Sequence, residues 1–204
     1  MIKKVNLTGK SKEELIKQYL EKNNLTENDI YLIEQEVEGK LFSSKKYSID
    51  VITKESVIEF IKEYFQKISE LMNLTINIEI RQTDDIYNIL LVSDNNAILI
   101  GKEGRTLEAL QTLLRQTINN QINLHLKINL DASNYKAKKN KNLEYEVKKI
   151  AREVLKSKVD AKLDPMTSFE RRIVHNVIND FKNLYTESEG ETPNRYVVIK
   201  YKED

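Results

Sequence analysis

The spacing of apolar residues changes abruptly near residue 73, and this change most constrains how the chain can fold. Between residues 57 and 72 apolar residues recur every three or four positions, which is the period of one helix face. Between residues 74 and 80 they alternate with polar residues, which is typical of a strand with one buried face. Because similar changes recur along the chain, we predict an α+β protein built from short helices and strands.

The composition limits the size of each folded unit. Hydrophobic residues make up 40% of the 204 residues, and charged residues make up 32%. This is enough apolar material for several small cores but not for one large core. The patterns divide the chain into three small modules, and we predict domains at residues 1–52, 53–131 and 132–204.

The first domain is predicted to be a βαββ unit. Residues 2–7 alternate and indicate a strand, and Ser11 with Glu14 has the spacing of a capping box that begins a helix. Residues 30–37 and 46–52 indicate two further strands. A unit of about fifty residues has little core of its own.

The second domain is predicted to run in the order α-β-β-α-α-β. Thr53 can cap its first helix, and alternating residues indicate strands at 74–80, 87–92 and 124–130. An apolar run at 97–100 leads into a loop that contains two of the five glycines of the chain. The helix after this loop has an apolar stripe made of Leu107, Leu110, Leu114 and Ile118.

The glycine loop is the first candidate contact, and it reads Gly101-Lys102-Glu103-Gly104, followed by Arg105. Two glycines three residues apart let a sugar-phosphate backbone approach without obstruction by a Cβ atom. The N–H groups of the next helix can then face a phosphate, and Lys102 and Arg105 can add positive charge. Glu103 opposes this role unless its side chain points away. Alone the motif is weak evidence, because a tight turn between two helices has the same pattern.

The third domain begins with a long basic helix. Between residues 136 and 158 there are nine Lys or Arg residues against three Glu residues. Thr167 with Glu170 has the capping-box spacing and begins a second helix. Residues 184–186 and 195–201 then indicate two short strands.

Charge is distributed unevenly along the chain. The whole sequence has 33 basic and 32 acidic residues and a net charge of +1, which at first argues against a nucleic-acid ligand. However, residues 53–131 carry a net charge of −3 and residues 132–182 carry a net charge of +6. A basic block of this kind is either a nucleic-acid surface or a solvated Lys-rich helix face, and charge alone leaves both interpretations open.

Arg171 and His175 form the second candidate contact, because residues four apart share one helix face. Arginine offers a permanent charge and a forked donor to phosphate. Histidine adds a ring that can stack and a donor or acceptor whose charge depends on pH. The structural alternative is a surface arginine beside a half-buried histidine.

Missing residue types disfavour several kinds of chemistry. The chain has no cysteine, which excludes disulfides, thiol catalysis and Cys-ligated zinc. Its two histidines are 50 positions apart, so we predict no metal site and no cofactor. We also predict no enzymatic activity, because no nucleophile is near His175 and Asp180 is not on its helix face. Apolar runs of at most four residues and the lack of a signal peptide predict a cytoplasmic protein that is not inserted in a membrane.

Residues 53–131 resemble a KH domain of the bacterial type-two order, and Ile100-Gly101-Lys102-Glu103-Gly104 matches the signature loop of that family. The resemblance implies that the loop clamps the backbone of about four single-stranded nucleotides. The bases would then lie in a groove beside the loop. Ile100, Leu107 and Leu110 are candidates to line this groove, although core positions are the simpler interpretation for all three.

Residues 163–175 and 187–199 resemble the Arg-x-x-x-His single-strand-binding domain, called here the R-three-H domain. Arg171 and His175 match its defining pair, and the resemblance makes Arg172 and Arg195 auxiliary phosphate contacts.

A type-two KH domain followed by an R-three-H domain resembles the Jag (SpoIIIJ-associated) family of bacterial RNA-binding proteins. That family also has a small N-terminal domain, which residues 1–52 resemble. It usually has a glycine-rich apolar stretch after the first helix and strands, where this chain has residues 39–46 with one glycine.

The family resemblance implies a cytoplasmic protein that binds single-stranded RNA and regulates gene expression post-transcriptionally. Single-stranded DNA is a second expected ligand, a small KH-only protein is an expected partner, and a homodimer is an expected assembly. The alternative is a protein-interaction scaffold whose KH face binds a protein partner, with RNA binding secondary. The acidic residue in the loop and the net charge of −3 over residues 53–131 keep this alternative open.

Overall fold

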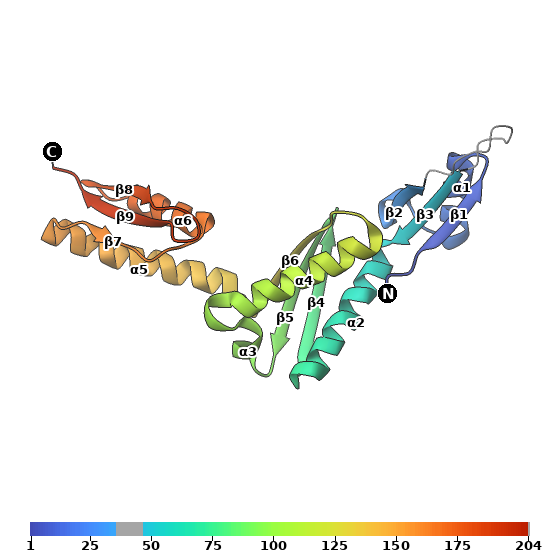
Figure 1. Ribbon diagram of the computed structural model, residues 1–204, viewed down its shortest axis with the longest axis horizontal. Coiled ribbons are helices and arrows are strands. Elements are labelled where there is room, and N and C mark those ends of the chain that lie inside the picture. Colours follow the sequence, from blue (N-terminus) through green and yellow to red (C-terminus); the bar gives the residue numbers. More distant parts are fainter. Residues whose placement is uncertain (36–46, 204) are drawn as a thin grey trace. The chain divides into compact units, whose positions relative to one another are not determined.

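The computed structural model describes residues 1–35 and 47–203, which form two compact units, 1–133 and 134–204 (Figure 1). The stretch at 39–46 and the adjoining ends of the two strands predicted at 30–37 and 46–52 lie outside the described residues. The predicted α+β class is confirmed, because helices and three separate three-stranded sheets make up the described chain. The three predicted domain boundaries stay a prediction.

The first sheet belongs to the N-terminal βαββ module, with order β1-β3-β2 and antiparallel pairing throughout. The Ser11 side chain accepts a hydrogen bond from the Glu14 N–H, so the predicted cap begins the helix. Ile30, Ile49 and Val51 form a small core under that helix. The elements are β1 (Val5–Gly9), α1 (Lys12–Asn23), β2 (Ile30–Gln35) and β3 (Tyr47–Thr53).

The second sheet carries the glycine loop and has the order β4-β5-β6, with β4 antiparallel and β6 parallel to β5. Two long helices, α2 and α4, lie on one face of this sheet (Figure 1). The predicted order α-β-β-α-α-β is confirmed by α2 (Lys54–Met72), β4 (Ile76–Thr83), β5 (Ile86–Ser93), α3 (Asn96–Ile100), α4 (Arg105–Ile122) and β6 (Lys127–Ala132).

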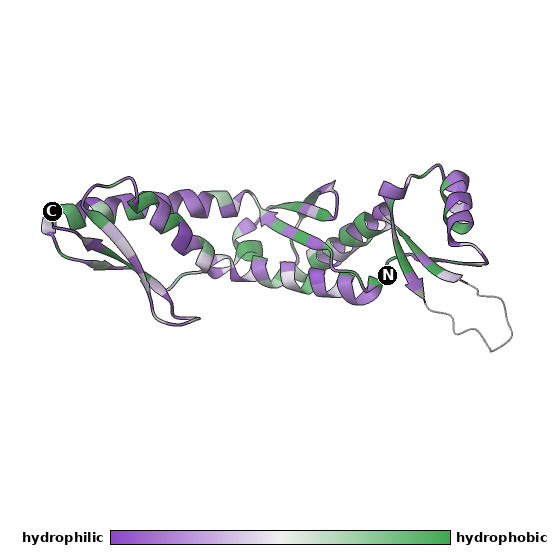
Figure 2. Cartoon of the chain, turned by 90° about the horizontal axis from the view of Figure 1, so that it is seen from above, coloured by the Kyte–Doolittle hydropathy of each residue, from purple (hydrophilic) through white to green (hydrophobic). Residues whose placement is uncertain are grey.

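The strand pattern explains why α2 and α4 pack on one particular face of this sheet. Buried and exposed residues alternate along β5 and β6, and the hydropathy colouring of Figure 2 shows the same banding. The buried residues Tyr87, Leu91 and Leu130 meet the apolar stripe of the helices, of which Phe65 and Leu114 are fully buried. The Tyr87 hydroxyl also lies 3.2 Å from that of Tyr31 on β2, which joins this module to the N-terminal one.

The second compact unit is a three-stranded antiparallel sheet in the order β7-β9-β8, covered by two helices. The core draws on α5, α6 and β9, and contains Val147, Ala151, Val154, Val174, Val177, Ile178, Val197 and Ile199. The elements are α5 (Tyr135–Ser157), β7 (Ala161–Lys162), α6 (Ser168–Ile178), β8 (Leu184–Glu189) and β9 (Tyr196–Tyr201). Strand β7 was not expected, because two residues are too few to display an alternating pattern.

Candidate nucleic-acid interface

The glycine loop connects α3 to α4, and its backbone takes conformations that favour glycine. Gly101 has φ +71° and ψ −177°, and Gly104 has φ +90°. A Cβ atom on Gly101 would lie 2.1 Å from Thr106 Oγ1 and 2.8 Å from Thr106 Cβ. Because neither the dihedral angles nor the space permits a side chain, residue 101 has to be glycine.

The turn after Gly101 decides which groups can meet an anion. Residues Lys102–Gly104 form one 3-10 turn. In this turn the Gly104 N–H donates to the Gly101 carbonyl at 3.3 Å, and the Arg105 N–H donates to the Lys102 carbonyl. These two N–H groups are therefore already engaged. A phosphate would meet the positive end of the α4 dipole and the loop side chains, rather than the full row of N–H groups expected from the sequence.

The loop charges are partly balanced within the loop itself. The Glu103 carboxylate and the Arg105 guanidinium form an ion pair at 3.3 Å, with both side chains largely exposed. Lys102 is exposed, and in the described part of the chain it makes no ion pair. Lys102 is therefore the loop cation most available to a phosphate, while Glu103 lowers the effective charge of Arg105.

The hydrophobic residues around the loop are not all exposed, as residues that line a groove would be. Leu107 is 2% exposed and Leu110 is 7% exposed, so both belong to the core. Ile100 is half-buried. Ile98, which was not singled out, is 45% exposed on α3 beside the loop. The sequence did not predict that Ile98 is exposed, because all four residues at 97–100 are apolar and their pattern does not show which side of the short helix faces the core.

The second candidate contact depends on the start of α6. Thr167 Oγ1 accepts from the Glu170 N–H at 3.3 Å, and Glu170 Oε2 accepts from the Thr167 N–H at 2.9 Å, so the predicted capping box is confirmed. Lys139 on α5 forms an ion pair with Glu170 at 2.7 Å. Burial raises the pKa of Glu170, but the hydrogen bonds from Lys139 and Thr167 outweigh this effect and hold the pKa below its usual value.

Arg171 is held in place by the backbone before the helix. Its Nη1 donates to the Met166 carbonyl at 2.9 Å, and the Met166 N–H in turn donates to the Arg195 carbonyl at 3.0 Å. The start of α6 is thus linked to the residue before β9, which is distant in the sequence. Because a guanidinium has five N–H donors, this one bond fixes the side chain and leaves donors for a ligand.

His175 is fixed from the opposite side by strand β8. Its Nδ1 lies 2.5 Å from Thr186 Oγ1. Burial lowers the pKa of His175 below its usual value, and the positive charge of Arg171 lowers it further. The neutral form of the ring therefore predominates at pH 7, and it can offer stacking or a hydrogen bond. Thr186 was not expected as its partner, because only the folded hairpin brings β8 to α6.

Two further arginines complete the set that the sequence singled out. Arg172 and Arg195 are both exposed, and neither makes an ion pair in the described part of the chain. Arg172 shares α6 with Arg171, while Arg195 lies immediately before β9. The α6 region therefore combines Arg171, which the Met166 carbonyl holds in place, the imidazole of His175, and two exposed arginine side chains.

Comparison with known proteins places both sites in recognised domains. Residues 58–130 match the family model described as the KhpA/KhpB KH domain, and residues 141–201 match that of the R-three-H domain. RNA-binding protein KhpB of Clostridium symbiosum is 32% identical over 205 residues, covering 98% of this chain and 92% of that protein. This chain belongs to the KhpB (Jag) family. The KhpB protein of Bacillus subtilis is 30% identical over 98% of this chain and its own full length.

A shorter match supports the same assignment. RNA-binding protein KhpB of Lactiplantibacillus plantarum is 28% identical over 145 residues, which are 71% of this chain and 45% of that protein. Within the described residues, no helix is both long and apolar enough to cross a membrane. The same residues contain no cluster of three or more His, Asp or Glu side chains arranged to hold a metal ion.

Proposed function

We propose that this chain binds single-stranded RNA through the glycine loop of its KH domain and the Arg171/His175 face of its R-three-H domain, and regulates gene expression post-transcriptionally in the cytoplasm. One observation carries the proposal: relatives named RNA-binding protein KhpB align with 98% of this chain, across both modules. The strained loop and the fixed Arg171/His175 pair are the geometry by which these modules would act.

The KH loop acts through the shape of its backbone, which depends on glycine at position 101. Glycine at 101 leaves room for the Thr106 side chain and so permits the turn that presents the positive end of the α4 dipole to the backbone of an RNA strand. Lys102 supplies the nearest charge that no carboxylate neutralises in the described structure. This arrangement recognises the sugar-phosphate chain and carries no base preference of its own.

The α6 face acts through fixed side chains. Arg171 offers a phosphate the donors that Met166 does not use, and the neutral His175 ring offers a base a stacking surface or one hydrogen bond. Arg172 and Arg195 add charge around the pair. Tethering two weak sites on one chain can raise the affinity for a strand that reaches both by roughly a hundredfold.

The function is tested by titrating a labelled 20-nucleotide single-stranded RNA with the full chain and following fluorescence anisotropy. Matched single-stranded DNA and double-stranded RNA are the other arms. We expect tightest binding to single-stranded RNA, weaker binding to single-stranded DNA, and affinity that falls linearly with the logarithm of salt concentration. No binding to any of the three at 0.1 M salt would reject the proposal.

We also propose protein assembly through the KH domain, with a small KH-only protein or with a second copy of this chain. Apolar side chains on the KH domain are exposed at Val92, Ile98 and Leu113, with 44%, 45% and 53% of each exposed. Light scattering after size exclusion, with and without RNase, tests this. A dimer that persists after RNase treatment supports a protein contact, and a monomer in both samples excludes the homodimer.

A further inference from the structure

The solvent side of α5 carries a continuous basic surface, called here the α5 stripe. It consists of Lys138, Lys141, Tyr145, Lys148, Lys149, Arg152 and Lys156, all exposed. Successive members are three, four, three, one, three and four positions apart, which keeps them on one side of a helix. We propose that the α5 stripe is a third RNA-binding surface, which follows the phosphate backbone of a single strand and stacks a base on Tyr145. This inference rests on the proposed function.

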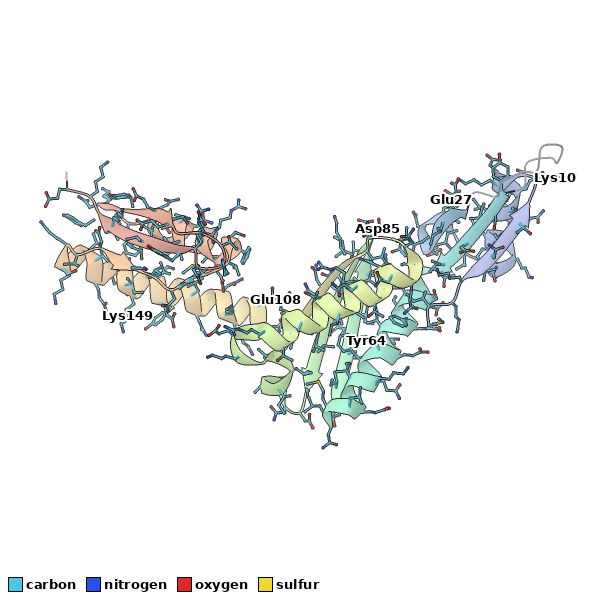
Figure 3. All side chains as sticks on the ribbon, in the orientation of Figure 1. Lys10, Glu27, Tyr64, Asp85, Glu108 and Lys149 are labelled. Atoms are coloured by element: carbon cyan, nitrogen blue, oxygen red, sulfur yellow. The ribbon has the colours of Figure 1, made fainter. Side chains whose placement is uncertain are left out.

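The orientation of the stripe is fixed by the core. Val147, Ala151 and Val154 lie on the opposite side of α5 and are at most 2% exposed, packed against α6 and β9. The helix cannot turn about its axis without exposing them. Lys149 accordingly projects from the side of α5 that faces away from β8 and β9 (Figure 3).

The six cations of the stripe make no direct ion pairs with the described residues, whereas Lys139 on another side of α5 pairs with Glu170. The three glutamates of α5, at 144, 146 and 153, border the stripe at three or four positions from its lysines and offset part of its charge, which leaves six cations against three anions. The excess positive charge that remains along the stripe repels itself, and a bound polyanion would relieve this repulsion.

The shape of the stripe matches an extended strand better than a single phosphate. Lys138 and Lys156 are 18 residues apart, which is about 27 Å along an α-helix. A row of charges of this length can follow several consecutive phosphates. Each phosphate that it neutralises in a single strand releases condensed counterions and adds about 0.7 to the salt slope of binding.

Tyr145 distinguishes the stripe from a solvated, lysine-rich helix face that binds no ligand. Its side chain is 72% exposed, and it lies near the middle of the stripe, between Lys141 and Lys148. An exposed aromatic ring among cations is the combination on which single-stranded bases stack. An acidic lipid surface fits less well, because binding in a membrane interface needs a free apolar helix face, and that of α5 is buried in the core.

The charge of the stripe is tested with the triple variant Lys141→Gln, Lys148→Gln and Arg152→Gln in the full chain. The matched control is Lys22→Gln, Lys62→Gln and Lys67→Gln, which removes the same charge from exposed positions on α1 and α2. We expect the triple variant to lower the magnitude of the salt slope by about 2 and the affinity for a 20-nucleotide single-stranded RNA by about tenfold at 0.1 M salt. The control should change affinity less than about twofold.

The stacking role is tested separately with Tyr145→Ala and Tyr145→Phe. Alanine should weaken binding about fivefold or more, while phenylalanine keeps the ring and should bind as the unmodified chain does. Because all these positions are exposed, we expect the variants to fold normally, and circular dichroism checks this. Vesicles of phosphatidylglycerol and phosphatidylcholine are a further arm, and a triple variant that loses only vesicle binding would overturn the inference.

The outcomes separate the two proposals. If the unmodified chain binds no RNA, the proposed function fails and the stripe inference fails with it. If the unmodified chain binds RNA but the triple variant matches its control, or Tyr145→Ala matches Tyr145→Phe, the proposed function stands and the α5 stripe is rejected as the third surface.

Discussion

In the proposed function, the glycine loop and the α6 face bind the same kind of strand in two different ways. In the loop the decisive group is an absent Cβ, and the charges of Glu103 and Arg105 compensate each other at 3.3 Å. On α6 the decisive groups are side chains, held by the Met166 carbonyl and by Thr186. A site made from backbone should therefore fail by loss of folding, and a site made from side chains should fail by loss of contact.

The largest effect is expected for Gly101→Ala, which breaks the backbone site. The new Cβ would lie 2.1 Å from Thr106 Oγ1 at a φ of +71°. We expect the KH domain to lose about 3 kcal/mol of stability or more, together with RNA binding at the loop. Thermal unfolding checks the first effect. Lys102→Ala is the control, and a Gly101→Ala variant as stable as this control would contradict the geometry of the loop.

The next effect is expected for the paired change Lys102→Asp and Glu103→Asp, which makes the loop acidic without straining it. Aspartate tolerates the left-handed conformation of residue 103 (φ +58°) better than glutamate does. Thermal stability should therefore be unchanged. RNA affinity should fall about tenfold at 0.1 M salt, because the loop loses the positive charge of Lys102 and gains a negative one. Lys62→Asp makes the same charge change on α2. Equal affinities for the two variants in a salt titration would remove the loop from the interface.

The α6 face is tested by Arg171→Ala combined with His175→Ala. We expect RNA affinity to fall several-fold and the salt slope to decrease by about 1, since one phosphate contact is lost. Losing the Arg171–Met166 bond should also cost about 1 kcal/mol of stability. Arg171→Lys keeps the charge and should retain the salt slope. A double variant that loses stability only, with RNA affinity intact, would show that the pair is structural.

The smallest effect is the pH dependence that His175 contributes to stability. Its pKa is lowered in the folded protein, so below the usual value of 6.5 the unfolded chain binds protons more readily than the folded chain does. The contribution of His175 is therefore fully present above pH 6.5 and is lost as pH falls through the folded-state pKa. His175→Asn should show a shallower decrease in melting temperature between pH 7.5 and 5.5. Identical decreases would contradict the burial of the ring.

Local sequence patterns predicted the elements well, because caps and apolar periods depend on neighbours in the chain. The capping boxes at Ser11/Glu14 and Thr167/Glu170 were expected, and the side-chain caps begin helices at both places, as they do at Thr53. The order of helices and strands in the KH domain was likewise predicted correctly from the sequence. Strand β7 was missed because its two residues are defined by their pairing with β9, not by a pattern of their own.

The candidate site residues stay a prediction, and the structure adds contacts between them that the sequence does not give. The sequence pointed to Gly101, Lys102, Arg171 and His175, yet it did not show that Glu103 pairs with Arg105 or that burial lowers the pKa of His175. Leu107 and Leu110 were groove candidates for which the core was the simpler interpretation, and their burial confirms the core. Each of these outcomes depends on distances between groups, which residue identity alone does not give.

The sequence by itself determined that this chain makes small α+β modules, with a glycine loop, an Arg/His helix and a basic helix. Those features follow from the conformational preferences and periodicity of neighbouring residues. Only the tertiary structure decided that residue 101 has no room for a Cβ, that Thr186 holds His175, and that the core turns the cations of α5 outward. The physical reason is that packing brings together groups far apart in the chain, and their contacts set which charges and faces remain for a ligand.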